Sequence, residues 1–258
     1  MNLFGGVPAY TRKIAGGVAV ALLWLWVSAP RRGISRRVLL TGVWAITLAA
    51  LIGGRAGYVI ENQRYFQQHP GAAFDLRDVG GLHGHGAWIG GLIALVIWSQ
   101  VTSQGWRNGG DFFTVPALLV AASAWWACAQ TACVWGRAMW QAPPLVRWLI
   151  VELPDRYHTI EPRFAVQYIG AAWAASLALA GLAMQKRERW LLPIYFAGTA
   201  ALSLLRADPA PKWPILQPWR SDTLLSLLLA FLLLGLSILQ RANHNVVPPN
   251  PHNTIEVL

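Results

Sequence analysis

Two histidines stand where an apolar run begins, in the stretch GGLHGHGAWIGGLIAL at residues 80–95. Histidine at a membrane boundary is costly unless its side chain has a partner. A nearby cation favours the neutral imidazole, which can accept a proton, so His85 beside Arg55 would suit a general base. The spacing alone favours a plainer interpretation, an interfacial histidine bonded to a carbonyl. No further histidines lie at ligand spacing from His83 and His85, so we expect no metal or haem.

Small residues recur at the spacing that brings helices together. Gly86 and Gly90 are four residues apart in this run, and Gly53 and Gly57 have the same spacing around Arg55. Glycines at this spacing let the backbones of two membrane helices approach closely. We therefore expect the helices that carry these pairs to pack together, with Arg55 and His85 near the same membrane boundary.

The composition sets the class of protein that must position these residues. The chain has 258 residues, of which 55% are hydrophobic and 12% are charged. A soluble domain has roughly 25% charged residues. The much lower charged fraction of this chain indicates a polytopic membrane protein. The net charge of +10 comes from basic residues between apolar runs, which favours anionic phospholipid as a partner over nucleic acid. We predict no cofactor, and we expect Cys128 and Cys133 to be buried thiols.

Seven apolar runs are candidates for transmembrane helices. They cover residues 14–29, 38–60, 85–101, 112–135, 164–184, 190–205 and 223–239. The predicted fold is therefore all-α, a seven-helix transmembrane domain over residues 1–240. The polar loops 61–81 and 136–163 would form a small cap on its outer face, and residues 241–258 would be a flexible tail.

The basic residues predict how the bundle is oriented. Nine basic residues would lie on one side of the membrane, mostly in short loops such as 30–37 and 185–189. The other twelve would lie on the opposite side, mostly in long loops. Short loops dominate the positive-inside rule. We therefore expect the N-terminus outside and the C-terminus in the cytoplasm.

Several motifs together resemble the prolipoprotein diacylglyceryl transferase family. The segment GGRAGYV at 53–59 resembles the Gly-Ala-Arg-x-Gly-Tyr that ends the family's second span, through Arg55 and Tyr58. The segment at 80–90 resembles the glycine-rich motif that opens its third span, including Gly80 and His85. WGR at 135–137, LRADP at 205–209 and TLLSLLL at 223–229 are similar to later family segments.

This resemblance implies a reaction and a localisation. The family transfers a diacylglyceryl group from phosphatidylglycerol to a lipobox cysteine thiol in the bacterial cytoplasmic (inner) membrane. A base must assist the thiol, because the thiolate is the nucleophile, and cations must stabilise the departing phosphate. The resemblance assigns His85 as the base if the protein is active. It assigns Arg55, Tyr58, Arg137 and Arg206 to lipid or phosphate binding.

Two arginines that the resemblance makes central are missing. Counting back from Arg137, the first arginine of the family's fourth-span signature falls on Trp125. Counting back from Arg206, an arginine of the sixth span falls on Thr199. Arg137 lies twelve residues from Trp125, roughly 18 Å of helix rise, and cannot replace the missing charge. The loss of two phosphate-binding charges should remove several kcal/mol of transition-state stabilisation.

Three functions follow from these observations. The first is a non-catalytic relative of the transferases that holds anionic phospholipid and serves as a structural or assembly subunit alongside other membrane proteins. The second is an active transferase with a diverged site. The third and weakest is a membrane subunit that binds a pigment or cofactor, suggested by the tryptophans within the apolar runs.

Overall fold

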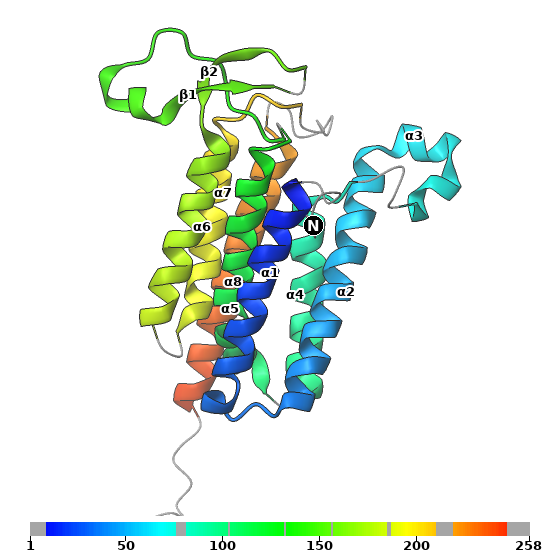
Figure 1. Ribbon diagram of the computed structural model, residues 1–258. Coiled ribbons are helices and arrows are strands. Elements are labelled where there is room, and N and C mark those ends of the chain that lie inside the picture. The colour runs from blue at the N-terminus through cyan, green and yellow to red at the C-terminus, as the bar shows by residue number, and fades with distance from the viewer. Residues whose placement is uncertain are drawn as a thin grey trace, which may run out of the picture.

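The computed structural model describes residues 9–75, 81–102, 104–131, 133–155, 157–184, 187–209 and 219–246. These residues form a bundle of long helices with a small cap at one end (Figure 1). The long helices are α1 (Ala9–Ser28), α2 (Arg36–Glu61), α4 (Gly84–Val101), α5 (Gly105–Cys128), α6 (Val166–Ala183), α7 (Leu191–Ser203) and α8 (Ser221–Val246). The short helices are η1 (Pro30–Arg32), α3 (Gln63–Gln68), η2 (Pro70–Phe74), η3 (Pro144–Leu149) and η4 (Glu188–Trp190).

Five helices of the described chain are long and apolar enough to cross a membrane: α2, α4, α5, α6 and α8 as far as Leu239. The sequence predicted seven. The helix α1 has 20 residues but carries Arg12 and Lys13 close to its start, which lower its mean hydropathy. The helix α7 has 13 residues, a rise of roughly 20 Å against the roughly 30 Å of a hydrocarbon core. Both nevertheless lie alongside the other helices in Figure 1.

Two helix contacts depend on small residues. In the pair α2 and α4, a Cβ on Gly53 would lie 2.4 Å from the carbonyl oxygen of Gly86, and one on Gly90 would lie 2.1 Å from that of Ala49. In the pair α1 and α5, Gly17 leaves room for the side chain of Ser123. The backbones of α2 and α4 are themselves in contact, so a larger residue has no room at their crossing.

The helix α5 corrects two predictions. It ends at Cys128, whereas the apolar run predicted a helix as far as residue 135. Cys128 and Cys133 form a disulfide with an S–S distance of 2.11 Å, so the prediction of two thiols was wrong. Val134 then takes a φ of 59°, a left-handed value that a β-branched residue rarely adopts. A hydropathy profile does not predict this turn, because apolar residues lie on both sides of it.

The cap contains a β-hairpin where the sequence predicted only loops. Strand β1 (Ile150–Pro154) pairs antiparallel with β2 (Ile160–Phe164), with Glu152 opposite Pro162. Isolated bridges join Ala138 to Arg163 and Gly136 to Arg206. The segment that follows the disulfide is thus hydrogen-bonded both to β2 and to the chain after α7. This pairing holds the cap at the ends of α6 and α7 (Figure 1).

Buried ion pairs lie at the end of the bundle opposite the cap. Asp111 of α5 accepts a hydrogen bond from the Arg189 guanidinium at 2.6 Å, and both side chains are buried. Arg32 of η1 pairs with the buried Glu188 of η4. These contacts join η1, α5 and η4.

The C-terminal helix passes the boundary expected at residue 240, because α8 continues to Val246. Residues 247–258, which complete the predicted tail, lie outside the described residues, as does Gly80.

Candidate functional site

His83 caps the N-terminus of α4. Its ring Nδ1 accepts a hydrogen bond from the backbone N–H of Gly86 at 3.1 Å. The backbone N–H of His83 donates to the carbonyl of Gly54 at 2.8 Å. Its Nε2 lies 2.9 Å from the carboxylate of Glu61 at the end of α2. A Cβ on Gly57 would lie 2.9 Å from the His83 ring, so glycine makes room for it there. His83 therefore has a structural role in joining α2 to α4.

His85 points to a different helix. Its Nε2 lies 2.8 Å from the hydroxyl of Ser226 on α8, and Ser226 is fully buried. Asp222, one helical turn before Ser226, and Arg206 both interact electrostatically with His85. The imidazole of His85 thus belongs to a polar cluster between α4, the start of α8 and the chain after α7.

Arg206 is neutralised by two carboxylates. Its guanidinium binds Asp208 through two hydrogen bonds, of 2.8 and 2.5 Å, and Asp222 at 2.5 Å. Arg220 binds the same two carboxylates, so the four side chains form a network without net charge. Burial alone would lower the pKa of Arg206, but the carboxylates outweigh burial and raise that pKa above its ordinary value. The charge of this guanidinium is therefore already balanced, which weakens its attraction for a phosphate.

Arg55 organises the segment that follows α2. Its guanidinium donates to the carbonyls of Ala72 at 2.6 Å, Ala73 at 2.7 Å and Asp75 at 2.9 Å. It also lies 5.5 Å from the ring centre of Tyr58, which packs against Gly81. These contacts tie Arg55 and Tyr58 to residues 72–75 and to Gly81, whereas His85 bonds to α8.

Arg137 is held by its backbone. Its N–H donates to the carbonyl of Leu205 at 2.9 Å, and its own carbonyl accepts from Phe164 at 3.1 Å. Its side chain is exposed and makes no hydrogen bond or ion pair within the described part of the chain. Among the described residues, Arg137 is thus the one of the three expected phosphate-binding arginines whose guanidinium has no partner. It could bind a ligand without losing a contact.

Aromatic packing fills the positions of the two missing arginines. The indole N–H of Trp125 donates to the hydroxyl of Tyr195 at 3.2 Å, and Thr199 donates to the carbonyl of Tyr195 at 2.6 Å. Trp88 packs on the Tyr195 ring with centroids 5.3 Å apart, and a Cβ on Gly170 would lie 2.4 Å from the Trp125 ring. Trp125 therefore bonds to a buried tyrosine, while the Thr199 hydroxyl is satisfied by the backbone of its own helix.

The structure thus brings His85 and Arg206 into one cluster and gives Arg55 and Arg137 other surroundings. Sequence reasoning did not assign Asp208, Arg220 or Asp222 to the site. A signal for them was present, because RAD at 206–208 and RSD at 220–222 repeat the spacing Arg-x-Asp. No group of three or more potential metal ligands occurs among the described residues.

Comparison with known proteins gives the family. A search of curated proteins finds no match to the chain. The family model for prolipoprotein diacylglyceryl transferase matches residues 3–239, which is nearly the whole chain. This match and the apolar helices identify an integral membrane protein. The chain belongs to the prolipoprotein diacylglyceryl transferase family.

Proposed function

We propose that this protein is a non-catalytic member of its family in the bacterial cytoplasmic membrane. In this proposal it holds anionic phospholipid and acts as a structural or assembly subunit of a membrane complex. The observation that carries the proposal is that Trp125 and Thr199 stand where the family pattern has arginines, with the Trp125 indole bonded to the buried Tyr195. An indole and a hydroxyl cannot supply the positive charge that a departing phosphate requires.

The remaining arginines support the same proposal. Arg206 is bound by Asp208 and Asp222, and Arg55 is bound by backbone carbonyls. Moving either guanidinium away from these partners onto a phosphate would leave the buried Asp222 or half-buried carbonyls unsatisfied, which costs about 1–3 kcal/mol for a fully buried group. Contact between Arg137 and a lipid phosphate needs no such rearrangement.

An active transferase is the second candidate, and the polar cluster around His85 favours it. The Nε2 of His85 bonds to Ser226, so the imidazole has a defined orientation. Arg206 lies within electrostatic range of it. An imidazole placed in this way could take the proton of a substrate thiol.

One assay separates the two candidates. Purified protein is incubated with phosphatidylglycerol and a lipobox peptide, and a thioether-linked diacylglyceryl peptide is sought by mass spectrometry. An active family member serves as the positive control. We expect no product from this chain. Product that disappears in His85→Ala would establish the active transferase and overturn our proposal.

A gain-of-function variant sharpens the test. Introducing Trp125→Arg and Thr199→Arg together restores the two charges that the family pattern contains. Product from a folded double variant, and none from the wild type, would assign the missing activity to these positions.

A further inference from the structure

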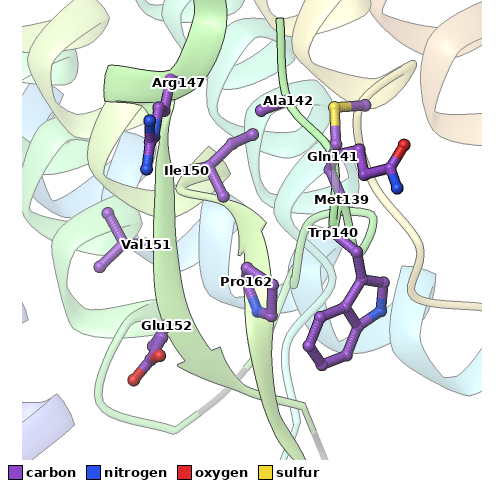
Figure 2. A pocket seen from close by; sticks show the side chains of 9 residues that line it. All are labelled: Met139, Trp140, Gln141, Ala142, Arg147, Ile150, Val151, Glu152 and Pro162. Atoms are coloured by element: carbon purple, nitrogen blue, oxygen red, sulfur yellow. The ribbon is translucent and has the colours of Figure 1, made fainter.

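A pocket lies in the cap, on elements other than those that carry His85 (Figure 2). Its volume is about 380 Å³, within the roughly 300–1,000 Å³ of small-molecule sites. Residues of the segment before η3, of η3 itself and of both strands line it. They are Met139, Trp140, Gln141, Ala142, Arg147, Ile150, Val151, Glu152 and Pro162.

The pocket contains one positive and one negative side chain that are not paired. In Figure 2, Arg147 lies at one end of the lining and Glu152 at the other, with Val151 between them. Both side chains are exposed, and neither has a hydrogen bond or ion pair within the ranges that the structure describes. A ligand with both charges could therefore bind both residues without displacing a contact.

Exposed apolar residues lie in the same segment of the chain as Arg147. Leu145 is 84% exposed, Trp148 is 76% exposed and Trp140 is 73% exposed. The indole N–H of Trp148 donates to the carbonyl of Leu145 at 2.8 Å, which fixes the ring beside the leucine. Large apolar side chains in this number are costly in water and are typical of the headgroup level of a membrane.

The hairpin is joined directly to a membrane helix. Strand β2 ends at Phe164, and the candidate span α6 begins at Val166. The cap therefore continues from the end of a span, and Figure 1 shows it above the ends of α6 and α7. A lipid in the adjacent leaflet can reach this pocket with its headgroup while its chains remain in the membrane.

We propose that this pocket binds the headgroup of a zwitterionic phospholipid with a primary amine, of the ethanolamine type. Arg147 binds the phosphate, and Glu152 accepts hydrogen bonds from the ammonium. The glycerol and upper acyl chains lie against Leu145 and Trp148. The site is separate from the His85 cluster, and it requires only that the chain lies in a membrane, whether or not it is catalytically active.

The charge pattern disfavours two other common headgroups. A glycerol headgroup has the phosphate but no cation, so it leaves Glu152 unpaired beside a negative charge. A choline headgroup has a quaternary ammonium, which cannot donate a hydrogen bond to the carboxylate. The pocket should therefore select the ethanolamine headgroup over both.

Native mass spectrometry tests this selectivity. The full-length protein is incubated with an equimolar mixture of phosphatidylethanolamine, phosphatidylglycerol and phosphatidylcholine with identical chains. We expect phosphatidylethanolamine to be retained roughly fivefold over the other two, the effect of one exposed charge pair of about 1 kcal/mol. Glu152→Gln should abolish the preference over phosphatidylglycerol. Arg147→Gln should reduce the retention of phosphatidylethanolamine.

Arg107→Gln is the matched control, since Arg107 is an exposed arginine of α5 near the other end of the bundle. It should keep the wild-type preference. Equal retention of the three lipids by the wild type, or a preference that survives both pocket variants, would overturn the proposal. Equally strong competition by water-soluble glycerophosphoethanolamine would also overturn it, because the site would then be one for a free metabolite.

Discussion

At the scale of single residues, one hydrogen bond joins α4 to α8. His85 could have bonded to a nearby carbonyl, as interfacial histidines commonly do. It bonds instead to Ser226, whose side chain is buried. Removal of this hydroxyl takes away the partner of the half-buried imidazole nitrogen, which is costly.

Ser226→Ala should therefore destabilise the protein by about 1 kcal/mol, the typical size of such a bond. The matched control is Ser237→Ala on the same helix. Ser237 is also buried, but its hydroxyl has no hydrogen-bond partner among the described residues. Thermal unfolding of both variants in the same detergent checks this prediction. Equal melting temperatures would mean that the His85–Ser226 bond contributes nothing.

At the scale of elements, the contact between α2 and α4 is a contact of backbones. A Cβ on Gly86 would lie 2.3 Å from the carbonyl oxygen of Gly53, and a backbone atom cannot move aside as a side chain can. Gly86→Ala should thus force the helices apart and cost about 1–3 kcal/mol, as overpacking does.

Gly84→Ala is the control for this prediction, because nothing lies within 4 Å of a Cβ at Gly84. It begins the same helix and should leave stability unchanged or slightly higher. Thermal unfolding measures both variants. If Gly86→Ala is as stable as Gly84→Ala, the two helices are not in backbone contact.

The end of α5 gives a second prediction at this scale. The Cys128–Cys133 disulfide lies on the same side of the bundle as the cap, because the 135–139 segment follows it directly. Disulfides persist in oxidising compartments. Protein purified without reductant should bind no maleimide until it is reduced, and then two per chain. Cys128→Ser should bind one maleimide without reduction. Two reactive thiols in the unreduced wild type would contradict the disulfide.

At the scale of the whole molecule, two independent features give the same orientation. The positive-inside rule predicts that loop 30–37 is cytoplasmic. The disulfide lies near the cap, at the opposite end of the bundle from this loop, and predicts that the cap faces the oxidising outer side. Because the two arguments share no residue, agreement between them is informative about the direction in which the bundle crosses the membrane.

A labelling experiment checks this orientation. We expect Ser35→Cys to be protected from an impermeant maleimide in intact cells and Thr159→Cys, on the cap, to be labelled. Both positions are exposed, so each is accessible once the membrane is opened. Labelling of Ser35→Cys from outside, with protection of Thr159→Cys, would reverse the orientation.

The sequence by itself determined the class of the protein and the helices that dominate it. Apolar runs of about 20 residues form helices in a membrane because no other local structure satisfies the backbone there. The glycine spacing of 53, 57, 86 and 90 identified residues that the structure places in contact, because spacing of four on a helix puts residues on one face. The motifs also predicted the family, which the match over residues 3–239 confirms.

Only the tertiary structure decided what each charge does. Arg206 and Asp222 are sixteen positions apart in the chain, and the pairing of α7 with α8 brings them together. The same holds for the carbonyls around Arg55, for the bond between Trp125 and Tyr195, and for the hairpin of the cap. An arginine in a sequence shows that a charge is present. Whether a carboxylate, a carbonyl or a ligand neutralises that charge depends on distances between segments that local sequence does not encode.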